Sequence, residues 1–274
     1  MKTSFYISTL TFLFLSFAVS SFAQDPETDS SEQEIKGGTV KYEQITRFNW
    51  NYEPTGNVQR DNWFASLPKS QTKAKVLYFN LEYSLYKEDL SSENEALNPR
   101  VQGMLDRMAF GQLPKPDLKK IFVDRKKNQK TELVELMTRF FLIENELESQ
   151  TWKPGNKQRK VQGYTCQEAT KKSGEEIITA WFTPNIPISI GPDNYSGLPG
   201  LILAIDINEK NVILATSVDL ATPPDSNLSK PKDGKKIKQE AFDKIVAEKV
   251  DEFEKAQKSK SAVKRKPLGE GKKY

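Results

Sequence analysis

Alternating apolar and polar positions run through most of the chain between residues 37 and 220. This period-two alternation, rich in β-branched and aromatic residues, is typical of strands that bury one face. The clearest example is residues 76–85, where every second side chain is apolar, and we predict one strand there with Leu77, Phe79, Leu81, Tyr83 and Leu85 on its buried face. Similar patterns predict strands at residues 39–48, 121–125, 131–137, 139–146, 160–170, 177–183, 201–207 and 212–218.

The predicted strands follow one another without helices of 10–15 residues between them, which argues against a parallel sheet of βαβ units. Polar segments at residues 126–130 and 208–211 are typical of hairpin turns. We therefore predict an α+β, mainly β fold, built on a curved antiparallel meander sheet that resembles a half-barrel. Residues 88–118 mix Ser, Asn, Pro and Gly with scattered apolar residues and are expected to form a partly helical insertion.

After the strands, apolar residues recur at helical spacing from Ile237 to about Lys258. This spacing predicts an amphipathic C-terminal helix that covers one face of the sheet. Residues 259–274 are lysine-rich, have little to bury, and are expected to be a flexible basic tail.

The first 23 residues have the pattern of a secretory signal peptide: Lys2, a mostly apolar run to Val19, and small residues at Ser21 and Ala23. Residues 24–36 are acidic and nearly free of apolar residues, which predicts a disordered leader. A single β-rich domain would then occupy residues 37–258. We expect a periplasmic or secreted protein of the cell envelope, with no transmembrane segment after cleavage of the signal peptide.

The chain contains no histidine and one cysteine, which excludes Ser-His-Asp and Cys-His nucleophiles and any internal disulfide. The remaining groups for chemistry are carboxylates, lysines, hydroxyls and one thiol. We predict that Cys166 packs as a buried small apolar residue, while a reactive thiol or an intermolecular disulfide stays open. We assign no catalytic residue, no metal ligand and no cofactor.

Charge is distributed unevenly, with five acids and one lysine in residues 24–36, and fifteen Lys or Arg against eight acids in residues 230–274. Clusters of basic residues can bind nucleic acid. The tail lacks interleaved aromatic residues that would stack on bases, and an exported protein rarely meets nucleic acid. We therefore expect no nucleic-acid partner.

Residues 181–203 form an apolar segment with four prolines and three glycines, unlike an ordinary polar surface loop. Leu198, Pro199, Gly200 and Leu201 have the pattern of a type II turn, in which glycine supplies a positive φ. We expect this turn to be pinned onto the sheet with its leucines buried. Two roles stay open: a loop that fills the core, or an apolar binding rim that includes Trp181 and Tyr195.

Several segments resemble the GLPGLI family of Gram-negative bacterial proteins. Residues 197–202 spell the hexapeptide GLPGLI itself, residues 163–170 (GYTCQEAT) are similar to a family strand, and residues 180–187 (AWFTPNIP) with Gly191 and Pro192 are similar to another family stretch. Trp152 stands where the family tends to carry a tryptophan. The resemblance implies an exported envelope protein of uncertain function, often considered beside outer-membrane receptors.

Three functions are compatible with these features. The favoured hypothesis is a non-enzymatic envelope protein that binds a protein partner, such as an outer-membrane receptor, or an apolar, lipid-like ligand. A hydrolase that uses Cys166 or paired carboxylates is the first alternative, with its acids drawn from Glu168, Glu175, Glu176, Asp193 and Asp206. A metal-handling protein is the second, with oxygen ligands around Asp193 and Asn194 or soft ligands from Cys166 and the methionines Met104, Met108 and Met137.

Overall fold

The structure is a computed structural model that describes residues 35–50, 52–92, 99–110 and 113–264. The predicted signal peptide, nearly all of the acidic leader and the end of the basic tail lie outside these residues. From Ile35 onward the chain forms one compact unit. Ile35, two residues before the predicted domain boundary at Gly37, packs against the main core.

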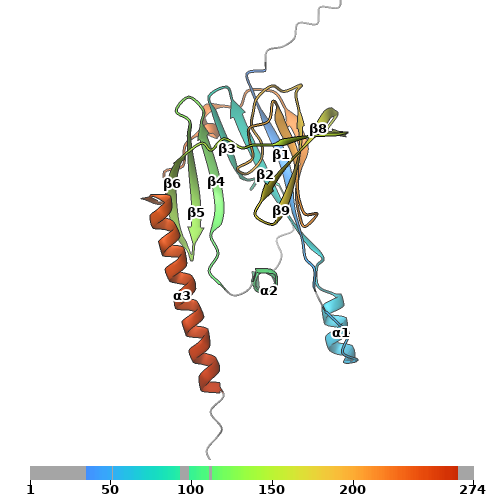
Figure 1. Cartoon of the computed structure of the whole chain (residues 1–274), viewed down its shortest axis with the longest axis vertical. Coiled ribbons are helices and arrows are strands. Elements are labelled where there is room, and N and C mark those ends of the chain that lie inside the picture. The colour runs from blue at the N-terminus through green and yellow to red at the C-terminus, as the bar shows by residue number, and fades with distance from the viewer. Residues whose placement is uncertain (1–34, 51, 93–98, 111–112, 265–274) are drawn as a thin grey trace, which may run out of the picture. The chain divides into compact units, whose positions relative to one another are not determined.

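The described residues form one sheet of twelve strands, in the order β12-β6-β5-β4-β3-β2-β1-β11-β10-β9-β8-β7 (Figure 1). The strands are β1 (Gly37–Arg47), β2 (Ser70–Asn80), β3 (Tyr83–Glu88), β4 (Asp117–Asp124), β5 (Gln129–Leu136), β6 (Arg139–Glu146), β7 (Lys153–Val161), β8 (Tyr164–Ser173), β9 (Glu176–Thr183), β10 (Leu201–Ile207), β11 (Asn211–Asp219) and β12 (Lys235–Ile237).

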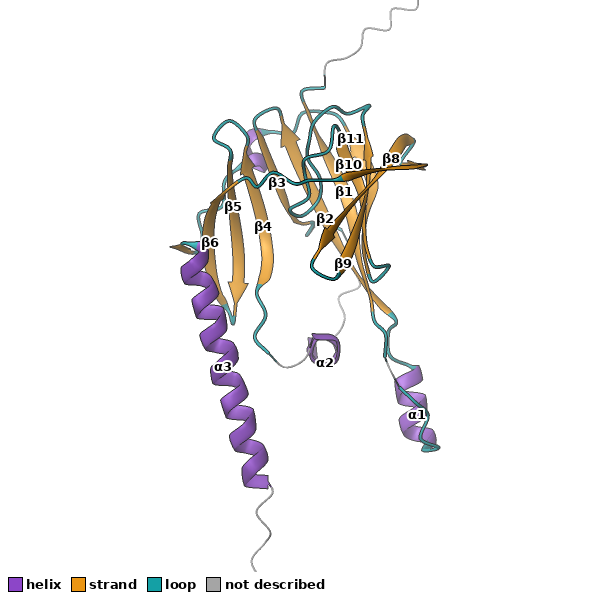
Figure 2. Cartoon of the chain, in the orientation of Figure 1, coloured by secondary structure: helices purple, strands orange, loops and turns teal. Residues whose placement is uncertain are grey.

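Two meanders make up this sheet, β1 to β6 and β7 to β11, and they join where β1 pairs with β11. Strands β6 and β7 therefore lie near opposite ends of the strand order, although only residues 147–152 connect them. Because six residues span roughly 20 Å at most, the sheet must curl to bring these ends near each other. Figure 2 shows this connection, which we call the strap, crossing from β6 toward β8.

The predicted fold class and the curved meander are confirmed. Every strand pair is antiparallel except β12 with β6, which is parallel and was not predicted.

Two segments that were each predicted to form one strand contain parts of two strands in the structure. The segment at residues 76–85 turns back at Asn80, whose side chain accepts hydrogen bonds from the backbone N–H groups of Glu82 and Tyr83 at 2.8 and 2.7 Å. Leu77 then pairs with Tyr86, and Leu81 lies exposed in the turn instead of on a buried face. The segment at residues 160–170 turns at Gln162 and Gly163, which both have positive φ, as a two-residue hairpin requires.

Three α-helices accompany the sheet in the described part of the chain: α1 (Val58–Ala65), α2 (Pro99–Phe110) and α3 (Gln239–Lys264). Helix α1, between β1 and β2, was not predicted. Its N-cap Asn57 accepts a hydrogen bond from the Arg60 N–H at 3.1 Å. Helix α2 lies within the predicted helical insertion, and a short 3-10 turn occupies Asp225–Leu228.

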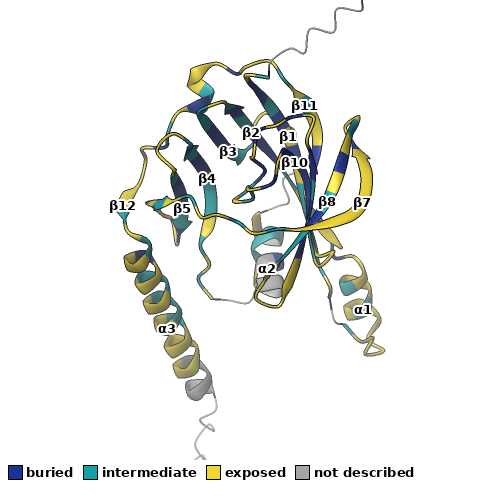
Figure 3. Cartoon of the chain, turned by 45° about the horizontal axis from the view of Figure 1, so that its top comes forward, coloured by how far each residue is buried: buried dark blue, intermediate teal, exposed yellow. Residues whose placement is uncertain are grey.

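The C-terminal helix exists as predicted but covers little of the sheet. Phe242, with Ile245 and Val246, packs on residues of β5 and β6, and the Phe242 ring meets Phe141 edge-on at 5.3 Å between centroids. Most of the remaining turns of α3 are exposed (Figure 3). The helix also continues six residues beyond its predicted end at Lys258, into the segment expected to be flexible.

The main core lies between the sheet and the apolar segment at residues 184–200. Ile186, Ile188, Ile190 and Leu198 of this segment are buried against strands from both meanders. Tyr42 on β1 is almost completely buried and donates a hydrogen bond to the Ile202 carbonyl at 2.8 Å. The segment therefore covers part of one face of the curled sheet.

Candidate functional site: a lysine-lined cavity on the sheet

The apolar segment with the GLPGLI hexapeptide is tucked against the sheet, as the sequence predicted. Leu198 and Leu201 are 5% and 0% exposed. The predicted type II turn is wrong, because the Leu201 N–H donates to the Ile186 carbonyl at 3.0 Å and not to Leu198. Instead, Gly200 N–H donates to the Leu198 carbonyl at 2.8 Å, which makes a three-residue γ-turn centred on Pro199.

Glycine is required at position 200 for two reasons. Its φ of +151° lies in a region that other residues rarely adopt. A Cβ atom there would also lie 2.1 Å from the Thr183 carbonyl oxygen on β9. The hexapeptide therefore sets how closely the loop approaches the end of β9.

The strap holds the segment from the other side. Trp152 donates its indole N–H to the Ser196 carbonyl at 2.8 Å, and the Gln150 side chain donates to the Asn194 carbonyl. The Lys171 ammonium lies 4.8 Å from the Trp152 ring centroid and 4.9 Å from that of Tyr195. Tyr195, a predicted rim residue, thus belongs to an aromatic clamp that fixes the loop.

Trp181 and Cys166, two further predicted residues, lie on the neighbouring strands β9 and β8, and each of them has Arg159 nearby. The Arg159 guanidinium carbon lies 4.4 Å from the Trp181 ring centroid. Cys166 is fully buried, and burial raises the pKa of its thiol to about 11, although nearby Arg159 acts in the opposite direction. A thiol with so high a pKa is almost entirely protonated at neutral pH and is a poor nucleophile.

Next to the apolar segment, residues of β1, β2 and β4 and Asp193 of the segment itself line a hollow of about 1060 Å³. A second hollow of about 270 Å³ lies beside the strap. Tyr86, Ile121 and Asp193 line both hollows and so form the wall between them. We refer to the two hollows together as the sheet cavity.

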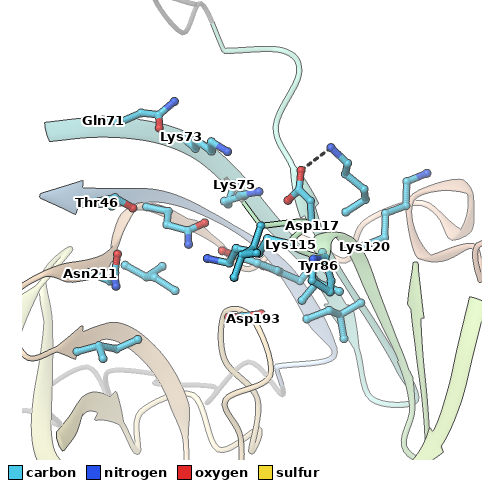
Figure 4. A pocket seen from close by; sticks show the side chains of 18 of the residues that line it. Thr46, Gln71, Lys73, Lys75, Tyr86, Lys115, Asp117, Lys120, Asp193 and Asn211 are labelled. Atoms are coloured by element: carbon cyan, nitrogen blue, oxygen red, sulfur yellow. Dashed lines mark hydrogen bonds and ion pairs between the residues drawn. The ribbon is translucent and has the colours of Figure 1, made fainter. Parts of the chain in front are cut away.

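Basic side chains dominate the larger hollow. Among the described residues, six basic groups line it against two acidic ones, Asp117 and Asp193; the basic residues are Lys73, Lys75, Arg107, Lys115, Lys119 and Lys120. Asp117 is paired with Lys119 at 2.6 Å, which leaves Asp193 as the acid that faces the hollow from the loop. Figure 4 shows Lys73, Lys75 and Tyr86 on the strands, with Asp193 on the loop across from them.

Burial perturbs the groups at the wall. Lys75 is 8% exposed, and burial lowers the pKa of its ammonium. Burial raises the pKa of the Asp193 carboxyl, and the carboxylate of Glu132 raises it further. Burial likewise raises the pKa of the Tyr86 hydroxyl, so Tyr86 stays neutral at every physiological pH.

Of the five acids considered for paired-carboxylate chemistry, only Asp193 lines the sheet cavity. Glu168 pairs with Lys157 at 3.4 Å, and Asp206 accepts a hydrogen bond from the Glu209 N–H at 2.7 Å. Glu175 and Glu176 lie exposed at the turn before β9. The acids are therefore spread over different parts of the sheet.

Cysteine and acidic residues do not cluster for metal binding, since no group of three or more that could hold an ion occurs in the part of the chain that the structure describes.

None of the described helices is both long and apolar enough to cross a membrane.

The cavity residues Lys73, Lys75 and Tyr86 were not predicted from the sequence. Asn80 could have indicated the turn between β2 and β3, because Asn is common in turns. A turn there places Tyr86 beside Leu77 and extends β2 back through Lys75 and Lys73.

Comparisons with known proteins bear on the same region. A family described as a protein of unknown function (Porph_ging) matches residues 142–204, which include the strap, β7 to β9 and the GLPGLI segment. The match covers less than a quarter of the chain, and it carries that description and not the GLPGLI name. No curated protein matches the chain.

Two solved structures of PNGF-II, in space groups P21 and C2, resemble the fold over 77% of this chain. Each is 16% identical with a TM-score of 0.49, and the chain spans about a third of their length, 33% and 32% respectively. At this level the likeness carries no argument about function. The family model thus matches the strap and the GLPGLI segment, and its description assigns no activity to them.

Proposed function

We propose that this protein is an exported, non-enzymatic binding protein of the cell envelope, whose sheet cavity holds a negatively charged ligand. The observation that carries the proposal is the excess of basic over acidic side chains in the larger hollow. Lysines on one face of a curved sheet create a positive potential that attracts and retains anions. The volume of about 1060 Å³ is at the upper end for small-molecule sites.

The chemistry of the lining supports an anionic ligand over the wholly apolar ligand that the sequence suggested. The most apolar part of the sheet face is already covered by Ile186, Ile188 and Ile190 of the loop. The open part instead presents Gln44, Gln71 and the lysines. An acyl chain without a charged group would remove the partly buried ammonium of Lys75 and the amide of Gln44 from water without a compensating charge, which is costly. An envelope protein as partner stays a prediction.

No catalytic set is assembled among the described residues, which supports a binding role over the hydrolase alternative. The Cys166 thiol is buried with a raised pKa, Glu168 pairs with Lys157, and Asp206 accepts a hydrogen bond within a turn. The extensive apolar core and the clamp around Tyr195 make the loop a fixed wall of the cavity.

A pair of dyes tests the sign of the ligand's charge. 1-Anilinonaphthalene-8-sulfonate carries one sulfonate, and N-phenyl-1-naphthylamine has the same ring system without it. We expect saturable 1:1 binding of the sulfonate by fluorescence titration, weakened by salt because the lysines are partly exposed. Tighter binding of the neutral dye would refute the proposal and restore the apolar ligand.

A charge reversal locates the binding. Lys73→Glu should weaken binding of the sulfonate by about fivefold, or about 1 kcal/mol, which is typical of a partly exposed charge pair. Lys160→Glu is the matched control, because Lys160 lies exposed on β7 outside both hollows. Equal effects of the two variants would mean that the dye responds only to overall charge.

A further inference from the structure

One buried donor on the wall of the sheet cavity has no partner, and a largely buried lysine lies beside it. The Tyr86 hydroxyl has no hydrogen-bond partner among the described residues, and Tyr86 is 7% exposed. Lys75 is 8% exposed, and no hydrogen bond or ion pair joins it to another described residue. On the paired strands β2 and β3, Leu77 lies opposite Tyr86, and Lys75 is two positions from Leu77 on the same face. Lys75 and Tyr86 are therefore diagonal neighbours.

Unsatisfied buried donors are rare in folded proteins because each loses its hydrogen bonds to water without replacement. A leucine and a phenylalanine would serve a purely structural wall better. The Arg125 Nη1 atom is the other buried side-chain atom without a partner in the described chain, and Arg125 also lines the smaller hollow. The other nitrogen atoms of the Arg125 guanidinium stabilise the β2–β3 turn, because they donate hydrogen bonds to the carbonyls of Leu81 and Tyr83.

The charges around this pair limit what it can bind. Lys130 and Glu132 on β5 form an ion pair at 3.1 Å and so offset each other. Asp193 faces the pair from the loop, and burial raises the pKa of its carboxyl. Lys75 lies opposite Glu88 on the paired strands, so the charge of its ammonium is partly offset as well. The pair of Lys75 and Tyr86 thus offers one positive charge at most, which suits a single negative charge better than a doubly charged group.

We infer that a carboxylate site lies where the two hollows meet, in which Lys75 Nζ in the larger hollow and Tyr86 Oη on the wall between the hollows both donate to one carboxylate of the ligand. The inference rests on the proposed function, and it specifies the acidic group and the place where it binds. A carboxylate accepts several hydrogen bonds on its two oxygens, so it satisfies both donors together. The rest of the ligand extends into the larger hollow, along Ile213 and Ile207 or toward Lys73.

Two kinds of envelope molecule end in a carboxylate, and the experiment separates them. Dodecanoate represents fatty acids, and trigalacturonate represents acidic sugars. We expect isothermal titration calorimetry on the purified protein to detect one of them, with dodecyl phosphate weaker than dodecanoate if the fatty acid is the ligand. A preference for dodecyl phosphate, or no binding of either carboxylate while the sulfonate dye binds, would overturn the inference.

Tyr86→Phe removes a single oxygen atom and keeps the ring. We expect it to weaken carboxylate binding by about tenfold, because a hydrogen bond to a charged group is lost. Lys75→Met, which keeps most of the length of the side chain and removes the ammonium, should weaken binding by at least as much. Thermal unfolding of each variant without ligand verifies that the fold is intact.

The outcomes separate the two proposals. If both variants bind the carboxylate as tightly as the unmodified protein does, while Lys73→Glu still weakens the dye, the carboxylate site is wrong and the anion cavity stands. If the unmodified protein binds neither carboxylates nor the sulfonate dye, the proposed function itself is wrong.

Discussion

Replacing Gly200 with alanine is the most direct test of how the loop is fixed to the sheet. The new Cβ would lie 2.1 Å from the Thr183 carbonyl oxygen, 2.7 Å from its carbonyl carbon and 3.0 Å from the Pro184 Cα. All three are backbone atoms, so no flexible side chain can move away. The methyl group must therefore displace the loop from β9 or force the two strands apart where Leu201 pairs with Thr183.

The cost has two parts. Holding a non-glycine residue at a φ of +151° costs about 1–3 kcal/mol. Overpacking against the backbone of β9 adds about 1–3 kcal/mol. Together they predict a loss of about 4 kcal/mol, which corresponds to a decrease of roughly 8–16 °C in Tm for a domain of this size.

Gly163→Ala is the matched control. Gly163 also has a positive φ, +81°, but an added Cβ meets nothing within 4 Å. It therefore carries the backbone strain without the overlap, and we expect a loss of about 1 kcal/mol. Urea unfolding followed by tryptophan fluorescence, together with calorimetric Tm values, measures both variants. If Gly200→Ala melts within about 2 °C of Gly163→Ala, the close approach to β9 does not contribute as argued.

Three further predictions concern other parts of the fold. Cys166 should react with Ellman's reagent only after unfolding in urea, because the thiol is buried and its pKa is about 11; rapid reaction of the native protein would contradict this. Phe242→Ala should destabilise the contact of α3 with β6 by about 3 kcal/mol, seen as faster hydrogen exchange in α3 than in β1, and equal exchange would argue against the contact. Asp193 has a raised pKa, so the folded state holds its proton more tightly than the unfolded state, and stability decreases as pH rises above about 4. The stability of Asp193→Asn relative to the unmodified protein should therefore increase between pH 4 and 7 in urea titrations, and a constant difference would show that Asp193 is not desolvated.

Local patterns predicted much of the fold because they depend on neighbours in sequence. Residues 201–207 and 212–218 are rich in aliphatic and β-branched residues, and they form β10 and β11 around a polar turn. The helix from Ile237 was predicted because its apolar spacing repeats over several turns. The burial of Leu198 and Leu201 was also predictable, since a proline-stiffened apolar loop must cover itself against something.

Where two strands run together without an obvious break, the sequence was misleading. At residues 76–85 the alternation continues through Asn80, but the turn reverses the chain there and changes which residues share a face. Tyr86 then lies beside Leu77 and Lys75, whereas the prediction had placed Leu81 and Leu85 with Leu77. The candidate site was missed for that reason.

The sequence by itself determined the strand-rich composition of the fold, the helix at its end and the apolar loop that fills the core, because each follows from side chains a few positions apart. Only the tertiary structure decided that β1 pairs with β11, that the strap bridges β6 and β7, and that Lys73, Lys75 and Tyr86 face Asp193 across a cavity. These contacts join residues more than a hundred positions apart in several cases. Their formation depends on how the two meanders curl and which faces the loop covers, and no local pattern encodes that geometry.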